Sequence, residues 1–216
     1  MLSTNLFHPN ERNQNGNTPF LSAAAFHPAT FFLLRLRSEV LLTAQNYSGD
    51  TALHLCVNYS SSSAVSALLK QVSILPTVQN KRGFTPLHIA CMYWQRGMFS
   101  FLLRQQSALV NIEDENGQTL LHIAVRNQKI NNIHALLEHE DVDVNVCDCK
   151  GRTPLHYAVE DKEKGREVVE MLLSHKDICV NIKDNERKTP LDIVNELEFD
   201  GKDEIISLLI QKGAVG

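Results

Sequence analysis

The sequence predicts an all-α fold of about six similar helix-turn-helix repeats, and three observations lead to this prediction. A hexapeptide related to Thr-Pro-Leu-His-Ile-Ala occurs six times, with its threonine at positions 18, 51, 85, 119, 153 and 189, at intervals of 33, 34, 34, 34 and 36 residues. A leucine pair follows five of these threonines by 17 or 19 residues. A polar segment separates each pair from the next threonine. Self-similarity at this period indicates a repeat protein, in which neighbouring hairpins bury each other's apolar faces.

The hexapeptide accounts for the first helix of each repeat. In the third repeat, the Thr85 hydroxyl can accept the backbone N–H two or three residues on, and Pro86 at the first helical position loses no hydrogen bond. Leu87 and Ala90 then share one helix face, and the small Ala90 allows close approach of another helix. We expect this helix to end near Trp94, because the apolar run 98–103 must begin the second helix.

The first two repeats differ from this pattern in their details. Residues 1–14 are polar and are expected to form a flexible tail. The first repeat has Leu21 where later repeats have histidine, and its second helix, around 31–34, is very apolar, as expected of an N-terminal cap. The second repeat should have its first helix at 51–59, with the serine run 60–63 capping a second helix from Ala64.

The last three repeats become more polar toward the end of the chain. The fourth spans 114–144, with a polar helix junction at 126–129. The fifth starts at Asp148, and its longer junction, 160–167, suggests an extended, solvated helix end. The sixth has Asp192 in place of histidine, Arg187 in place of glycine, and a charged segment from 196 to 204. A polar last repeat is what ends such an array in water.

At these positions the sequence resembles the ankyrin repeat family. The Thr-Pro-Leu-His boxes, the glycines two residues before the threonines, the leucine pairs and the Val-Asn dipeptides at 110–111, 144–145 and 180–181 carry the resemblance, which covers about residues 15–214. It implies an all-α ankyrin-repeat solenoid with β-turn fingers along one edge. We expect one curved domain over 15–216, with repeats starting near 15, 47, 81, 115, 149 and 185, after the tail 1–14.

Composition narrows the function classes. The formal net charge of −4 gives no general reason to expect nucleic acid binding. No apolar run reaches the roughly 18 residues of a membrane span, and the N-terminus lacks a signal-peptide pattern. Five cysteines, an odd number, suit free thiols in a reducing compartment. We therefore expect a cytoplasmic or nuclear monomer without a membrane span.

The sequence contains few candidate catalytic or metal-binding residues. A histidine recurs at one place in four successive repeats, but copies about 10 Å apart could not share a metal whose bonds are about 2 Å long; the resemblance implies a local bond to the turn for His54, His88, His122 and His156. Cys147 and Cys149, near His139 and His156, lack a second ligand pair in reach. No catalytic motif is present, so we expect no enzyme activity, no cofactor and no metal.

The resemblance places partners on the concave side, at the finger tips and the ends of the first helices. Aromatic residues, Met and Arg are typical of interface centres. The transferred positions predict a partner site whose centre consists of Tyr47, Tyr59, Phe84, Met92, Tyr93 and Trp94, with Lys81 and Arg82 at a tip and a flank of Arg126, Lys150 and Arg152. That flank would favour an acidic or phosphorylated segment. Alternatively, Met92 and Trp94 only fill the helix junction.

The sequence thus predicts a scaffold or adaptor that binds a folded domain or an extended peptide through the concave face of repeats two to four. Two alternatives remain open. One is an IkappaB-like inhibitor that masks a transcription factor or another signalling protein, and the other is a host-directed effector or viral mimic. Three asparagines also resemble those that asparaginyl hydroxylases modify, although closing the turn is their ordinary role: Asn111, Asn145 and Asn181.

Overall fold

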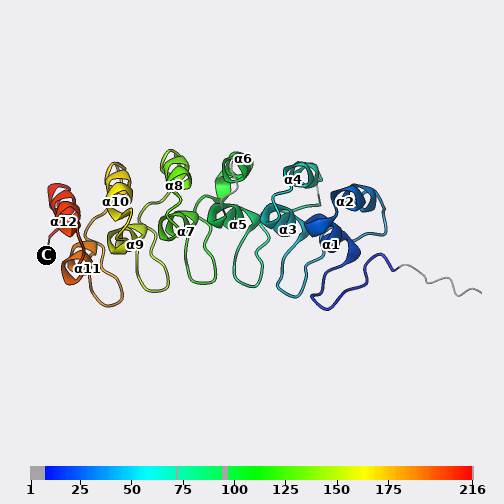
Figure 1. The fold of residues 1–216 in the computed structure, drawn as a ribbon, viewed down its shortest axis with the longest axis horizontal. Coiled ribbons are helices and arrows are strands. Elements are labelled where there is room, and N and C mark those ends of the chain that lie inside the picture. Colours follow the sequence, from blue (N-terminus) through cyan, green and yellow to red (C-terminus); the bar gives the residue numbers. More distant parts are fainter. Residues whose placement is uncertain (1–7, 72, 94–96, 216) are drawn as a thin grey trace, which may run out of the picture. The chain divides into compact units, whose positions relative to one another are not determined.

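The computed structural model describes residues 8–71, 73–93 and 97–215 (Figure 1). These residues form twelve α-helices and one short 3-10 helix, and no β-strand occurs among them. The all-α prediction is therefore confirmed. Two compact blocks are distinguished and are described separately below: the N-terminal block, Met1–Met98, and the C-terminal block, Phe99–Gly216.

In the N-terminal block, the first helices of three repeats lie next to one another and the second helices pack on them (Figure 1). The contacts run from α1 to α2 and α3, and from α3 to α4 and α5. The helices of this block are α1 (Pro19–Phe26), α2 (Pro28–Leu34), α3 (Ala52–Asn58), α4 (Ser62–Leu69) and α5 (Pro86–Met92).

The C-terminal block repeats this arrangement. Here α7, α9 and α11 form one row, and α8, α10 and α12 form the second (Figure 1). The block opens with α6 (Met98–Gln105) and η1 (Ser107–Leu109), and its hairpins are α7 (Leu120–Arg126), α8 (Ile130–Leu137), α9 (Pro154–Glu160), α10 (Gly165–Leu173), α11 (Pro190–Glu196) and α12 (Lys202–Gln211).

The core lies between the two rows of helices in each block. The leucine of the hexapeptide is fully or almost fully buried in every repeat that has it next to histidine, as Leu53, Leu87, Leu121 and Leu155 show. Each such side chain contributes about 2 kcal/mol through burial. The small residues three positions later, Cys56, Ala90, Ala124 and Ala158, are equally buried, so neighbouring helices approach closely at these positions.

The threonine boxes begin the first helices as predicted. Thr51 and His54 form a reciprocal capping pair, in which the His54 Nδ1 accepts the Thr51 backbone N–H at 3.2 Å. The other ring nitrogen, Nε2, lies 2.8 Å from the Phe84 carbonyl oxygen and donates to it. The bond to Thr51 is the local bond that was expected, and the bond to Phe84 in addition joins this helix start to the finger of the next repeat.

The fingers are held by an Asn or Asp side chain that accepts the backbone N–H groups two and four residues on. Asp148 accepts those of Lys150 and Arg152 at 2.9 and 3.0 Å. A left-handed residue, Gly151 with φ of 72°, completes the turn. In the last repeat Arg187 adopts φ of 67° at the corresponding place, so a non-glycine residue there carries backbone strain.

Two predicted details were wrong. Helix α4 begins at Ser62, and its N-cap, Ser61, makes no side-chain capping bond, so the serine run does not cap the helix as expected. In the fifth repeat, the longer junction does not extend the end of α9, which has the same seven residues as α7. A turn follows it, in which the Asp161 carboxylate accepts the N–H groups of Glu163 and Lys164 before α10.

The predicted tail, 1–14, lies partly outside the described residues, which begin at His8. Within its described part, the Asn10 side chain bonds the backbone of Glu39 and Leu41, and Arg12 donates to the carbonyl of Gly16. The prediction of one domain over 15–216 stays a prediction.

Candidate functional site

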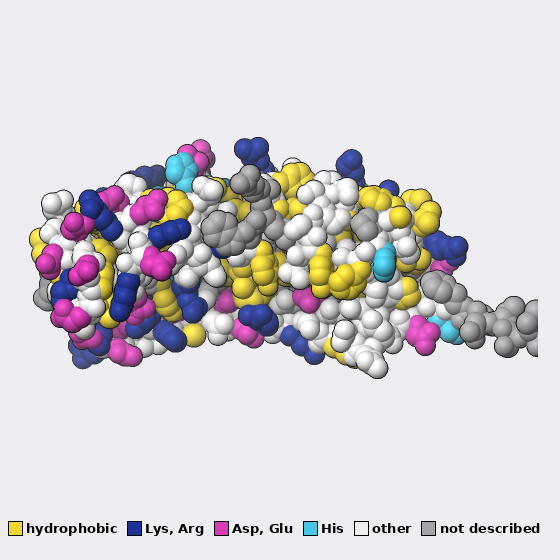
Figure 2. Space-filling view, viewed as in Figure 1, with side chains coloured by type: hydrophobic (Ala, Val, Ile, Leu, Met, Phe, Trp, Pro, Cys, Tyr) yellow, Lys and Arg dark blue, Asp and Glu magenta, His cyan; other side chains and the backbone are white. Residues whose placement is uncertain are grey.

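A groove of about 400 Å³ lies in the N-terminal block, between two fingers and the exposed sides of α3 and α5. Figure 2 shows hydrophobic side chains over these helices on this face. The residues that give the groove its chemistry are Tyr47, Asp50, Lys81, Arg82, Met92 and Tyr93. Of the predicted centre, Tyr47, Phe84, Met92 and Tyr93 line the groove together with the tip residues Lys81 and Arg82, whereas Tyr59 is not among its lining residues.

Exposed aromatic rings surround the groove. Tyr47, Tyr59 and Tyr93 are 59%, 47% and 48% exposed. The ring of Tyr59 lies against that of Phe26, with 4.7 Å between centroids. Phe26, Tyr59 and Tyr93 all stand eight residues after their repeat's threonine. Sequence reasoning missed Phe26, although this shared register could have identified it.

Phe84 has a different position from the one expected of an exposed anchor. It is only 8% exposed, because its ring stacks on His88 and the guanidinium of Arg82 covers it at 4.6 Å from the centroid. Phe84 therefore forms the floor of the groove. Met92 is half-buried beside it, and Trp94 lies outside the described residues.

The edge of the groove carries unbalanced positive charge. Lys81 and Arg82 are exposed at a finger tip, and among the described residues neither pairs with a carboxylate. The one acid that lines the groove, Asp50, accepts a hydrogen bond of 2.8 Å from the Asn80 side chain. The groove thus combines an apolar floor with a cationic edge.

In the C-terminal block, hydrogen-bonded polar pairs occupy the positions that correspond to the groove. The residue before each threonine bonds the residue eight positions later: Gln118 Oε1 accepts from Arg126 at 2.9 Å, and Arg152 donates to Glu160 at 2.9 Å. Lys188 pairs in the same way with Glu196. In the N-terminal block these two positions in the third repeat are Phe84 and Met92, so the same site is apolar.

Arg152 is neutralised within its own block. Its guanidinium bonds Glu160 and also Asp184, at 3.3 Å, and lies 5.7 Å from the centroid of Tyr157. Arg126 approaches the same ring at 5.1 Å. Of the predicted flank, Arg126 and Arg152 therefore have internal partners, while Lys150 is exposed at a finger tip.

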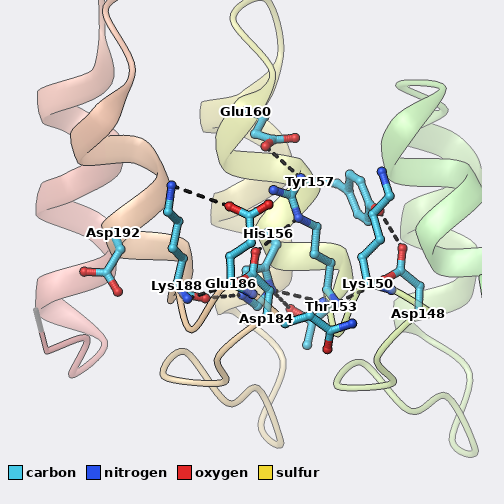
Figure 3. Close-up of polar contacts among 12 residues, drawn as sticks. Asp148, Lys150, Thr153, His156, Tyr157, Glu160, Asp184, Glu186, Lys188 and Asp192 are labelled. Atoms are coloured by element: carbon cyan, nitrogen blue, oxygen red, sulfur yellow. Dashed lines mark hydrogen bonds and ion pairs between the residues drawn. The ribbon is translucent and has the colours of Figure 1, made fainter.

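Tyr157 and Asp148 form the centre of this polar network (Figure 3). The Tyr157 hydroxyl donates to the Asp148 carboxylate. Burial and this bond raise the pKa of Tyr157 to about 12. Partial burial opposes ionisation of Asp148, but hydrogen bonds from Tyr157 and from backbone N–H groups outweigh it and hold the pKa of Asp148 below its ordinary value.

The three asparagines named for hydroxylation each bridge to the next turn. Asn111 donates to Asp141 O at 2.7 Å and accepts from the N–H of Asp143 at 2.9 Å. Asn145 bonds Asp177 and Cys179, and Asn181 bonds Gly213 and Val215, in the same way. An enzyme would have to break both bonds to reach these side chains, and their hydroxylation stays a prediction.

The described part of the chain contains no cluster of metal-ligating side chains, and its free cysteines differ in exposure. No group of three or more His, Cys, Asp or Glu side chains there could hold a metal ion. Cys147, Cys149 and Cys179 are exposed free thiols, whereas Cys56 is buried, which raises its pKa to about 12. No described helix has the length and apolarity to cross a lipid bilayer.

Comparison with known proteins identifies the repeats. A family model described as ankyrin repeats (three copies) matches residues 21–114, 73–146, 95–184 and 140–215. No curated protein sequence matches the chain.

Several solved structures share the fold. The ankyrin repeat domain of Bcl-3, described as a unique member of the IkappaB protein family, has a TM-score of 0.78 and 24% identity, covering 94% of this chain and 86% of that one. The ankyrin repeat protein EF0377 has a TM-score of 0.78 and 22% identity, covering 89% of this chain and 96% of that one. An ankyrin repeat domain (ABAYE2397) from Acinetobacter baumannii AYE has a TM-score of 0.78 and 22% identity, covering 91% of this chain and 98% of that one. These likenesses show the fold alone.

Proposed function

The chain belongs to the ankyrin repeat family, and from this premise we propose that it binds a partner protein through the groove of its N-terminal block, without catalysing a reaction. Ankyrin repeats are protein-interaction modules, which supports the general class. The groove, defined by the fingers 46–50 and 80–84 with α3 and α5, supports the specific site.

One observation carries this proposal. Three successive repeats of the C-terminal block fill the position before threonine and the position eight residues later with a hydrogen-bonded polar pair. The third repeat instead has Phe84 and Met92 there, and the exposed side chains of Tyr47 and Tyr93 line the same groove. An apolar surface rimmed by polar groups is typical of an interaction site.

The groove is suited to binding because its parts are held in place before a partner arrives. The fingers are fixed by Asn46 and Asn80, whose side chains each accept two backbone N–H groups. The Tyr59 ring rests on Phe26, and tyrosine has few rotatable bonds to immobilise. Little conformational entropy is therefore lost on association, which favours affinity.

We propose a scaffold or adaptor role in preference to an inhibitor of the IkappaB kind. The likeness to the Bcl-3 domain is 24% in identity and concerns the fold, so it supports no particular partner. The site itself lies on one short stretch of two fingers and two helices, which is enough for a peptide or for the edge of a domain.

The test is affinity capture from cells of the source organism, read by quantitative mass spectrometry. The groove variant Tyr47→Ser/Tyr93→Ser changes two exposed tyrosines that line the groove, and the control Leu33→Ser/Leu75→Ser changes two leucines of the same block that are exposed but do not line it. Circular dichroism confirms that each variant keeps its helices.

We expect the groove variant to lose at least about tenfold of a specific partner, which corresponds to roughly 1.4 kcal/mol, while the control retains it. Equal capture by the wild type and the groove variant would place the site elsewhere. If the wild type captures no protein above background, the proposed function is wrong.

A further inference from the structure

The positive edge of the groove is the feature that defines the partner. Lys81 and Arg82 are adjacent, exposed and without a carboxylate partner among the described residues. Arg82 also has its guanidinium stacked on the Phe84 ring, so its charge is held over the groove. The neighbouring Asp50 already accepts a hydrogen bond from Asn80, and it is the one acid of the lining.

Two cations of the C-terminal block on the corresponding face have carboxylate partners. Arg152 is paired with Glu160 and Asp184, and Lys188 with Glu196. Figure 2 shows basic and acidic side chains next to each other over α9 and α11. Arg152 and Lys188 are therefore balanced internally, and Lys150 is a single finger-tip cation without a carboxylate partner among the described residues. Lys81 and Arg82 instead stand side by side at the groove and leave a net attraction for an anion.

The size of the groove limits what can enter it. Its volume, about 400 Å³, is within the range of sites that hold a small molecule or a few side chains. Met92 and Tyr93 line it on the helix side, and Lys81 and Arg82 on the finger side. A large apolar side chain would contact the first pair while acidic neighbours in an extended chain reach the second.

We propose that the groove binds an extended acidic segment of the partner, in which one large apolar residue is flanked by Asp or Glu. This inference rests on the proposed function and specifies its partner. The apolar side chain packs on Met92, Tyr93 and the Phe84 floor. The carboxylates pair with Lys81 and Arg82, so binding weakens as the salt concentration rises.

The probe is a display library of random peptides about nine residues long, roughly 30 Å when extended, selected on the immobilised full-length chain. Selection is repeated on Lys81→Glu/Arg82→Glu, whose exposed side chains are not part of the finger's backbone bonds. The control Lys162→Glu/Lys176→Glu makes the same charge change at exposed sites of the C-terminal block.

We expect the wild type and the control to enrich peptides with a large apolar residue and at least two acids, by about tenfold over the starting library. The Lys81→Glu/Arg82→Glu variant should lose the preference for acidic peptides. One enriched peptide, made synthetically, should bind this variant at least about tenfold more weakly than it binds the wild type. This exceeds the factor of a few that one exposed ion pair supplies, because repulsion replaces attraction at two positions.

Four results overturn the inference. The selected peptides could lack acidic residues, or the acidic preference could survive in Lys81→Glu/Arg82→Glu. Either result shows that Lys81 and Arg82 do not select the partner, while the proposed function stands. If no peptide is enriched although a protein is captured by the groove, the partner is not an extended segment. If neither peptides nor proteins bind, the proposed function itself is wrong.

Discussion

At the scale of single residues, buried histidines link stability to pH. Burial lowers the pKa of His54, His122 and His156 from 6.5, because the folded protein disfavours the charged ring. The unfolded chain therefore binds these protons first as the pH falls. Stability is complete above about pH 6.5 and is lost below it, until the folded pKa values are reached.

We predict that the free energy of unfolding falls when the pH drops from about 7.5 to about 5.5, because the unfolded chain takes up protons on these rings before the folded protein does. Urea unfolding followed by circular dichroism measures it. The variant His122→Gln should show a weaker pH dependence than the wild type. A flat profile over this range would contradict the neutral, buried state of the three rings.

Tyr157 offers a test of the polar network in the C-terminal block. We predict that Tyr157→Phe lowers the free energy of unfolding by about 1–2 kcal/mol, because the Asp148 carboxylate loses a hydrogen-bond donor. Tyr157→Leu should cost about 1 kcal/mol more, since the contacts with Arg126 and Arg152 are lost too. In both variants NMR titration should show a raised Asp148 pKa; an unchanged pKa would exclude the bond.

At the scale of helices and fingers, the starts of the first helices were predictable, whereas the junctions to the second helices were not. Thr at the cap and Pro at the first helical position act within three residues, so the sequence specifies them locally. The turn at 161–164 and the start of α4 at Ser62 depend on where the second helix can pack, which involves contacts with another repeat. Such contacts are not encoded in a local pattern.

Helix α10 begins at a glycine for a steric reason. A Cβ on Gly165 would lie 2.8 Å from the carbonyl oxygen of Ala158 in α9, which is backbone and cannot move aside. We predict that Gly165→Ala destabilises the protein by about 1–3 kcal/mol, although alanine favours helices by about 1 kcal/mol.

Thermal and urea unfolding measure this effect. The control Asn131→Ala changes an exposed position of α8 and should be neutral or slightly stabilising. A stabilised Gly165→Ala protein would show that the two helices are not packed so closely.

A single substitution in the last finger should stabilise the protein. Arg187 adopts φ of 67°, the conformation that glycine occupies in the other fingers. We predict that Arg187→Gly stabilises the protein by about 0.5–1 kcal/mol, because relief of strain of about 1–2 kcal/mol exceeds the entropic cost of glycine. Gly151→Ala is the converse change and should destabilise, since its Cβ would also meet the backbone of Asn185 at 2.9 Å. A loss of stability in Arg187→Gly would refute the argument.

At the scale of the whole molecule, the two blocks differ in how they use charge. The aspartates whose pKa is lowered, Asp148, Asp184 and Asp192, all belong to the C-terminal block. Among the described residues of the N-terminal block, the one carboxyl with a lowered pKa is Glu39, which is exposed. The stability that these aspartates supply is present above about pH 4 and is lost as the pH falls through their folded pKa values.

We therefore predict that strong acid, from about pH 4 to about pH 2.5, opens the C-terminal block more than the N-terminal block. Hydrogen exchange followed by mass spectrometry, resolved by peptide, measures the protection of each block. The variant Asp184→Asn should reduce the difference between the blocks. Equal loss of protection in both blocks at every pH would contradict this account.

The site was predictable in part. The register of the repeats identified Tyr47, Tyr59, Met92 and Tyr93 as exposed positions near finger tips and helix ends, and the structure places them at or beside one groove. The register could not show that Arg82 covers Phe84. It also could not show the pairing across eight residues that neutralises the cations of the C-terminal block, because the fold itself brings a finger to a helix end.

The joints between fingers have a mechanical consequence. In each block, adjacent fingers are tied by one backbone hydrogen bond, such as Lys81 N–H to Ser48 O at 2.9 Å and Asn185 N–H to Lys150 O at 2.9 Å. At each joint, side-chain bonds such as that from Asn80 to Asp50 share the load with this backbone bond. Tension along the fingers of one block would therefore act on each joint as a small group of bonds, and the fingers of a block should separate one joint at a time.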